Sequence, residues 1–350
     1  MDITEEFHEL DPTDQNCILT ESLLSNKHPE LFTGCRLYTA GEVLPSLTRF
    51  GIFNPSVVKV GDLLYIVYRA EPSEVTWGGH FLEEKAVPVF QTATIEGDRV
   101  VKEGEILPVV GGTAFTMRQE DWRLFSDPDT GEVYSNFTNY FYFNPGWPQE
   151  DVRSTTCVSR LVDNRFEFLR ELTPAHLRAP RREEKNWLIF KHRGEWLCIY
   201  SLEPYILFSL NSGFGVDSVK KFSEKPLSRV HQSFLANGAN PVFNDTPSLG
   251  PHYLVFCHNY THAVGDNKRN RTYYHYAAVL SYDTLDIIGF TENPVVGGGD
   301  RDGRHDQIMY VSGVHIENNR IFLFYGEGDT HSEYCSFPED LVYDNLTHVS

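Results

Sequence analysis

Methionine, paired cysteines and long apolar runs are scarce in this chain of 350 residues. Only 3 methionines stand beside 24 phenylalanines and 18 tyrosines, a balance that suits β-sheets better than helical bundles. The six cysteines are scattered without a Cys-x-x-Cys pair, which predicts reduced thiols in a cytosolic protein. No apolar stretch approaches the length of about 20 residues that a membrane helix needs, so we expect no membrane partner.

Positive charge is also in short supply. The 30 lysines and arginines face 49 acidic residues, which gives a formal net charge of −19. We therefore expect no nucleic-acid partner, because the phosphate backbone requires concentrated basic residues. An acidic protein that binds phosphate must build a local basic pocket instead. The N-terminal stretch MDITEEFHELD is acidic and lacks an apolar core, so we expect no secretory signal and a cytoplasmic location.

What the sequence does have is a pattern that returns five times. Each copy opens with a short polar cluster, continues as an apolar strand and ends in charged or hydroxyl-bearing residues. The copies are marked by Asn54, Glu120, Lys185, Asn240 and Val311. Strand-rich repeats of this length are typical of the four-stranded blades of a β-propeller. We predict an all-β fold, a five-bladed β-propeller over residues 49–350, with a short N-terminal extension over residues 1–48.

Two glycine-containing turns and one charged loop complete this outline. Gly61-Asp62 and Arg193-Gly194 lie between apolar runs and predict hairpin turns. Residues 297–306, GGGDRDGRHD, resemble part of a calcium loop but lack the spaced glutamate that completes it, so we expect no metal site. A propeller gathers the same edge of every blade around one opening, so polar residues of distant repeats should meet in one central pocket.

Several short motifs occur at the blade openings and strand ends. They are Asn54-Pro55, Tyr68-Arg69, Glu120-Asp121-x-Arg123, Lys185-Asn186-Trp187, His258 after an apolar strand, and Tyr325-Gly326-x-x-Asp329. In this order and spacing they resemble the five-bladed propeller enzymes that act on β-mannosides. These are the inverting mannoside phosphorylases and hydrolases of glycoside hydrolase family 130, with the related propeller mannosyltransferases. The resemblance implies a carbohydrate-active enzyme that cleaves or forms β-mannoside bonds on a sugar or oligosaccharide.

Asp121 is the general acid that the resemblance implies. Cleavage of a glycosidic bond requires a proton for the leaving oxygen and a nucleophile at the anomeric carbon. In phosphorylases of the family the proton is thought to pass through a sugar hydroxyl. Glu120-Asp121-Trp122-Arg123 could also be a surface turn with a structural ion pair, and its matching place in the repeat favours the functional interpretation. The family motif usually has proline where this chain has Trp122, which we expect to alter the local turn.

Substrate-binding residues follow from the residue types and the resemblance together. Phosphate favours cations with hydroxyl or imidazole donors, so we expect it to contact Arg69, Arg123, Lys185 and His258. Asn54 and Asp329 are expected to bind sugar hydroxyls, and Trp187 or Tyr205 to stack on a sugar ring, although Trp187 could equally be core packing. The remaining substrate-binding candidates are Glu120, Asn186, His231 and Tyr325.

Two departures from the family pattern leave the reaction open. Glu203 places a carboxylate near the expected phosphate site, where it would repel phosphate but could activate water as a second catalytic residue. Asn237-Gly238 stands where relatives often have Arg-Gly-Gly, and His231 is a candidate to replace that anion ligand. The first hypothesis is a phosphorylase with inorganic phosphate as co-substrate and no other cofactor. The alternatives are an inverting hydrolase, a mannosyltransferase using a nucleotide sugar, and a non-catalytic carbohydrate-binding propeller. The sugar, its linkage and the oligomeric state stay open.

Overall fold

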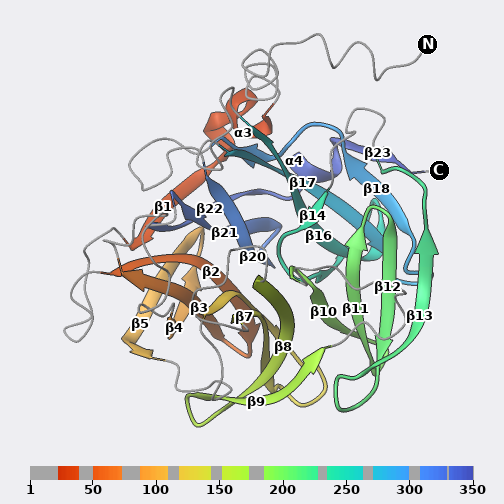
Figure 1. Ribbon diagram of the computed structural model, residues 1–350. Helices are drawn as coiled ribbons and strands as arrows, with labels where there is room; N and C mark the ends of the chain where they lie inside the picture. Colours follow the sequence, from red (N-terminus) through yellow and green to blue (C-terminus); the bar gives the residue numbers. More distant parts are fainter. Residues whose placement is uncertain are drawn as a thin grey trace.

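The computed structural model describes residues 23–38, 50–72, 87–108, 118–142, 152–172, 185–227, 235–262, 271–298, 308–328 and 331–349. These residues are mostly strands, and the strands form five antiparallel sheets around a common centre (Figure 1). The described helical segments are short: α3 (Leu24–Lys27), the 3₁₀ turn η1 (Pro29–Leu31) and α4 (Asp340–Tyr343). The prediction of an all-β, propeller-like fold is confirmed.

Three consecutive segments each fold into one four-stranded blade. The first comprises β2 (Phe50–Val60), β3 (Leu63–Pro72), β4 (Val87–Glu96) and β5 (Arg99–Pro108). The second comprises β6 (Arg118–Ser126), β7 (Val133–Tyr142), β8 (Val152–Val162) and β9 (Arg165–Leu172). The third comprises β10 (Leu188–His192), β11 (Glu195–Leu202), β12 (Tyr205–Leu210) and β13 (Val216–Ser223). Consecutive strands pair in sequence order, and Gly61-Asp62 and Arg193-Gly194 form the predicted hairpin turns.

A fourth blade takes its strands from two distant parts of the sequence. It contains β20 (Met309–Glu317), β21 (Arg320–Glu327) and β22 (His331–Pro338), and β1 (Thr33–Tyr38) pairs with β22 at the edge opposite β20. Residues of β1 fall inside the stretch that we expected to be an N-terminal extension, so this part of it belongs to the sheet structure. Backbone pairing of β1 with β22 joins the two parts, and Arg36 of β1 adds ion pairs to Glu333 at 2.7 Å and Glu327 at 3.3 Å.

The fifth sheet is larger and departs from the predicted blade. It consists of β14 (Ala236–Asn237), β15 (Val242–Thr246), β16 (Gly250–His262), β17 (Arg271–Ser281), β18 (Ile287–Thr291), β19 (Val296–Gly297) and β23 (Leu346–His348). The structure thus shows four regular four-stranded blades, not five, and one sheet of seven strands. The reason is that β14 and β15 pair with the same strand, β16, on either side of a break at residues 238–241. In addition, the short β19 pairs with β17, and β23 extends the far edge beyond β18.

Apolar side chains fill the space between neighbouring blades. Trp122 stacks on Phe137 with ring centroids 4.2 Å apart, and meets Phe166 edge-on at 5.3 Å. The same cluster includes Val67 and Phe90 of the first blade. Trp122 is therefore a core residue between the first two blades, and in the position where the family motif usually has proline it contributes packing.

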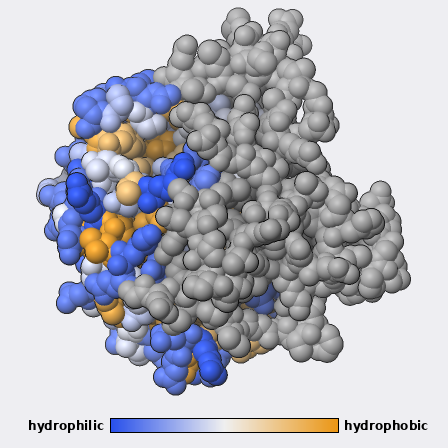
Figure 2. Space-filling model, turned by 90° about the vertical axis from the view of Figure 1, so that its left-hand side faces the viewer, coloured by the Kyte–Doolittle hydropathy of each residue, from blue (hydrophilic) through white to orange (hydrophobic). Residues whose placement is uncertain are grey.

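The described residues contain free cysteines and only short helical segments. Cys35, Cys157, Cys198, Cys257 and Cys335 carry free thiols, and Cys17 lies outside the described residues. Among the described segments, no helix has the length and apolar character needed to cross a membrane. On the side of the molecule drawn in Figure 2, the hydrophobic groups of the described residues form small areas between hydrophilic ones. The coloured part of this side therefore shows no broad apolar surface.

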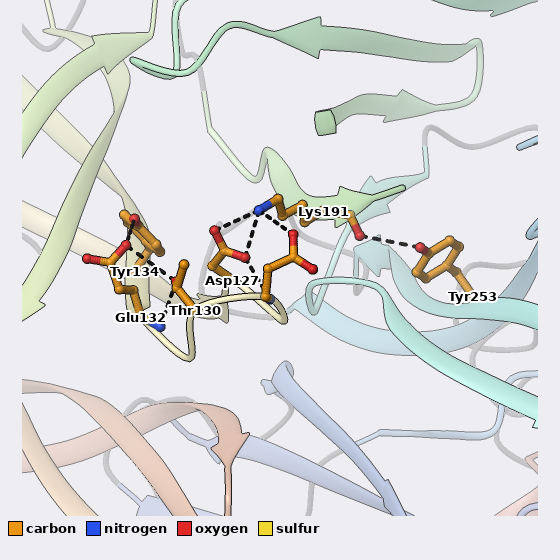
Figure 3. Close-up of polar contacts among 7 residues, drawn as sticks. Asp127, Thr130, Glu132, Tyr134, Lys191 and Tyr253 are labelled. Atoms are coloured by element: carbon orange, nitrogen blue, oxygen red, sulfur yellow. Dashed lines mark hydrogen bonds and ion pairs between the residues drawn. The ribbon is translucent and has the colours of Figure 1, made fainter. Parts of the chain in front are cut away.

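An ion pair joins the second blade to the third at the turn that follows β6 (Figure 3). Lys191 Nζ donates to both carboxylate oxygens of Asp127 at 2.7 Å and lies 2.8 Å from Asp129 Oδ2. Burial opposes ionisation of Asp127, but the bonds from Lys191 and from the Asp129 backbone outweigh it and lower the pKa of the Asp127 carboxyl. The pair thus holds two blades together at neutral pH.

We predict that Lys191→Met lowers the free energy of unfolding by about 2 kcal/mol, because it leaves the buried Asp127 carboxylate without its cation. Urea denaturation measures the change. Lys220→Met is the matched control, since Lys220 pairs with Glu195 on an exposed surface and should change stability by less than about 0.5 kcal/mol. Equal small losses in both variants would show that the pair at Asp127 does not join the blades.

Candidate active site

The candidate site lies where the inner strands of three blades begin and the backbone leaves the regular strand conformation. Asn54, Asp121 and Asn186 have positive φ angles of 50°, 52° and 64°. This left-handed region is uncommon for residues other than glycine and most accessible to asparagine and aspartate. The pairing register shifts at Asn54 in β2 and at Asp121 in β6, so both residues occupy bulges that redirect their side chains. The three residues hold equivalent places in three of the repeats found in the sequence.

The Asp121 carboxylate is held by two residues of the first blade. Asn54 Nδ2 donates to Asp121 Oδ1 at 3.2 Å, and Arg69 Nη1 lies 3.6 Å from the same oxygen. Arg69 Nη2 also donates to Glu120 Oε1 at 2.8 Å, so one guanidinium group faces two carboxylates. No described residue donates a hydrogen bond to Asp121 Oδ2, and the side chain is 14% exposed. One carboxylate oxygen is therefore held by Asn54 and Arg69, and the other accepts no hydrogen bond from a described residue.

Arg123 lies beneath this carboxylate and is only 1% exposed. Its Nε donates to Gly238 O at 2.6 Å and its Nη1 to Asp121 O at 2.8 Å. Its Nη2 donates to Asn186 Oδ1 at 2.9 Å and to the Tyr310 hydroxyl. A buried guanidinium with these partners is occupied, so the expectation that Arg123 itself contacts phosphate does not fit the geometry. It joins parts of several blades instead.

Histidine and lysine form the other side of the site. Burial, together with His275, Arg123 and Lys185, holds the pKa of His258 well below its usual value. Burial lowers the pKa of His275 to about 4, although its Nε2–H donates to Met309 O at 2.7 Å. Both imidazoles are therefore neutral at pH 7. Lys185, beside His258, is the partly exposed cation here, so the predicted cluster of cations is present but only partly available to an anion.

The two predicted stacking residues lie in the core. Trp187 is 1% exposed and packs edge-on against Tyr200 at 5.2 Å, which is the core-packing alternative. Tyr205 is 4% exposed, and its hydroxyl donates to Leu285 O at 2.8 Å within an apolar cluster. Neither ring presents a face on which a sugar could stack, so this expectation is not met.

Glu203 lies on the other side of β16 from His258. Its Oε1 accepts a hydrogen bond from Leu227 N at 3.3 Å, and burial raises the pKa of its carboxyl. Burial and the Glu203 carboxylate also raise the pKa of the Cys257 thiol. Cys257 and His258 are adjacent in a strand and point to opposite faces. The structure therefore does not bring Glu203 to the cations, contrary to the expectation that it lies near them.

The motif around Tyr325 contributes a glycine. The Tyr325 hydroxyl donates to Glu333 Oε2 at 3.0 Å and so points to a neighbouring strand. A Cβ on Gly326 would lie 2.1 Å from Asn54 Oδ1 and 2.7 Å from Asn54 N, closer than any side chain allows. Glycine at 326 is thus the residue of this motif that makes room for Asn54. Asp329 and His231, the other predicted sugar and anion ligands, lie outside the described residues.

Tyr310, His275 and Gly326 are site residues that the sequence reasoning did not select. The ring of Tyr310 lies edge-on to His258 with centroids 5.2 Å apart, and its hydroxyl donates to Asn186 Oδ1 at 3.1 Å. Tyr310 directly precedes Val311, which marks the fifth repeat, so its place at the opening of that repeat was a signal that could have identified it. His275 lies opposite His258 in the strand pairing of β16 with β17, a relation that no local pattern reveals.

No profile of a known protein family and no curated protein sequence matches the chain. Its structure resembles β-1,2-mannobiose phosphorylase from Listeria innocua in complex with β-1,2-mannobiose, with a TM-score of 0.61 and 15% identity over 91% of this chain and 98% of that chain. It also resembles a structure from the GH130 family of mannoside phosphorylases. That family is described as containing glycoside hydrolases that target β-1,2-mannosidic linkages in Candida mannan. The TM-score is 0.60 and the identity 15%, over 83% of this chain and 85% of that one.

A third similar structure is MPT-4, a mannose phosphorylase from Leishmania mexicana in complex with phosphate. The TM-score is 0.55 and the identity 12%, over 90% of this chain and 92% of the other. The chain therefore has the fold of the GH130 mannoside phosphorylases and hydrolases, as the resemblance of its motifs implied.

We predict that His275 makes the protein less stable in acid. An unfolded histidine takes up a proton near pH 6.5, whereas His275 does so only near pH 4. The unfolded state thus binds more protons between these values, and stability falls as the pH drops through this window. From this residue alone, the loss between pH 7 and pH 5 is about 2 kcal/mol.

His275→Gln tests this, because glutamine can still donate to Met309 O but takes up no proton. Urea denaturation at pH 7 and pH 5 should show a smaller acid-induced loss in this variant than in the wild type. His348→Gln changes an exposed histidine and should leave the difference as in the wild type. An unchanged pH dependence in His275→Gln would mean that His275 is not held neutral by burial.

Proposed function

We propose that the protein is an inverting, carbohydrate-active enzyme that cleaves β-mannoside bonds with inorganic phosphate, and that Asp121 is its general acid. The observation that carries this proposal is the arrangement at Asp121. A carboxylate with one oxygen held by Asn54 and Arg69 lies in a buried network that also contains Arg123, beside Lys185 and His258. This combination of an acid with nearby anion-binding groups suits phosphorolysis of a glycoside.

The seven-stranded sheet serves in this proposal as the fifth blade. It contributes Gly238 through its backbone oxygen and His258 and His275 through their side chains. With the four regular blades it would complete the five-bladed propeller that the repeats predict. The site then receives residues from every blade, which supports one central active site.

The ligands of the similar structures support the choice of substrates. One is bound to β-1,2-mannobiose and another to phosphate. A β-mannobiose and inorganic phosphate are therefore the substrates proposed for this chain, which would work in the cytoplasm without a further cofactor. The sugar would approach Asp121 Oδ2, and phosphate would contact Lys185 and a neutral His258.

Phosphate is favoured over water as the nucleophile by the position of Glu203. The hydrolytic alternative requires a second carboxylate that activates water opposite the acid. Glu203 was the candidate, and its only hydrogen bond to a described residue comes from Leu227 N, on the far side of β16 from His258. His258 interacts with both Lys185 and Arg123, and Lys185 and His258 suit an anion better than they suit water activation.

The reaction balances as a single displacement. A phosphate oxygen forms a bond to the anomeric carbon while the bond from that carbon to the glycosidic oxygen breaks. Asp121 supplies the proton that the leaving oxygen receives, either directly or through a sugar hydroxyl as the resemblance implies. Attack from the side opposite the leaving group inverts the anomeric carbon, so a β-mannoside yields an α-sugar 1-phosphate.

We predict that sugar 1-phosphate forms from β-mannobiose only when inorganic phosphate is present. Asp121→Asn should lower kcat by about 10²- to 10⁴-fold, because it removes the proton donor while keeping the shape of the side chain. Asp283→Asn alters an exposed aspartate that pairs with Arg193, and should leave the rate unchanged. Products are measured by chromatography with and without phosphate.

Release of free mannose with or without phosphate would contradict the phosphorylase activity and support the hydrolase instead. Full activity in Asp121→Asn would remove Asp121 from the reaction. An absence of product in both arms would support a nucleotide-sugar transferase or a non-catalytic propeller, and would contradict the proposed function.

A further inference from the structure

The hydroxyl of Tyr310 lies between side chains of two other blades. Tyr310 is on β20 and is 7% exposed. Its oxygen accepts a hydrogen bond from Arg123 Nη2, and its hydrogen is donated to Asn186 Oδ1 at 3.1 Å. Burial raises the pKa of Tyr310, so the hydroxyl keeps this proton at neutral pH. Arg123 belongs to β6, and Asn186 immediately precedes Trp187 and β10.

The contacts of Tyr310 lead to the backbone of Asp121. Arg123 Nη1 donates to Asp121 O at 2.8 Å, and Asp121 is held at a φ of 52° within the bulge of β6. A positive φ is uncommon for residues other than glycine, and although aspartate adopts it more readily than most, surrounding contacts help to hold it there. The hydrogen bond to Asp121 O is such a contact, and its direction depends on the orientation of the guanidinium plane.

Four acceptors fix the orientation of the Arg123 guanidinium plane. One of them is the Tyr310 oxygen, and a second, Asn186 Oδ1, is itself bound by the Tyr310 hydroxyl. Gly238 O accepts from Nε, Asp121 O from Nη1, and both Asn186 Oδ1 and the Tyr310 oxygen from Nη2. Tyr310 also fixes Asn186 by donating to the same Oδ1 that accepts from Arg123. Loss of the hydroxyl removes one acceptor from Arg123 and one of the two donors to Asn186 Oδ1.

We infer that Tyr310 is a positioning residue for the general acid, and that it acts through Arg123 on the backbone of Asp121. The inference rests on the proposed function, since it gives Asp121 the role of acid. The Tyr310 hydroxyl donates to Asn186 Oδ1 and has no hydrogen bond to the Asp121 carboxylate. Its hydroxyl keeps Asp121 Oδ2 directed at the leaving oxygen, and small displacements of a catalytic group are costly to the rate.

Tyr310→Phe tests the inference, because it removes the hydroxyl and retains the ring that packs against His258. With β-mannobiose and saturating phosphate, kcat should fall by about 10- to 100-fold while KM for both substrates changes by less than roughly threefold. The loss should shrink to less than about threefold on a dinitrophenyl β-mannoside, whose leaving group departs without a proton. A merely structural role would lower the rate equally on both substrates.

Tyr253→Phe is the matched control. Tyr253 is a buried tyrosine whose hydroxyl lies 3.1 Å from His192 Nδ1 and donates to Lys191 O at 3.4 Å, and it has no hydrogen bond to Arg123 or Asn186 (Figure 3). It should lose a comparable amount of stability, measured by thermal unfolding, with kcat unchanged on both mannosides.

Asn186→Gly provides a second variant if Tyr310→Phe fails to fold. Glycine adopts a positive φ without strain and removes the oxygen shared by Arg123 and Tyr310, so the same dependence on the leaving group should follow. Equal rate losses on the two mannosides, or no loss on β-mannobiose, would overturn the inference. Asp121→Asn measured on both mannosides separates the two proposals: if it shows no preference for the dinitrophenyl substrate, the acid role itself fails.

Discussion

The buried guanidinium group of Arg123 is the interaction on which the arrangement of the site depends. A buried charge is stable only when hydrogen bonds replace water, and here the partners come from separate parts of the propeller. Gly238 O, Asp121 O, Asn186 Oδ1 and the Tyr310 hydroxyl all accept from it. Four residues that are far apart in the sequence, from Asp121 to Tyr310, are thereby held around one side chain. The charge of Arg123 is thus used to assemble the site.

A positive φ angle recurs at the start of three blades and places polar side chains near Arg123. Asn54, Asp121 and Asn186 all take a positive φ at the opening of a repeat, where the Asn54 side chain contacts Asp121 and the Asn186 side chain contacts Arg123. A polar side chain in a regular strand would point into one of the two sheet faces, so the departure from strand geometry is what makes a central site possible. Gly326 allows the fourth blade to approach Asn54 at this place.

The sequence predicted those parts of the structure that local patterns determine. The strand repeats indicated an all-β propeller, and the openings of the repeats identified Asn54, Asp121 and Asn186. The break at residues 238–241 was not predicted, because a split inner strand looks like any apolar run followed by a turn. Glu203 and Tyr205 were placed wrongly in the expected site, because one residue of register decides which face of a strand a side chain occupies. Partners across blades cannot be read from spacing alone.

Fold and function are separate claims here, since a propeller hosts several chemistries and the site must decide among them. The proposed phosphorolysis, with Asp121 as the acid and phosphate at Lys185 and His258, is a single displacement with attack opposite the leaving group. The most direct test is proton NMR of the sugar phosphate formed in the first minutes from a β-mannoside and phosphate. The account predicts the α-anomer as the initial product. A β-anomer would show retention through a covalent intermediate and would contradict it.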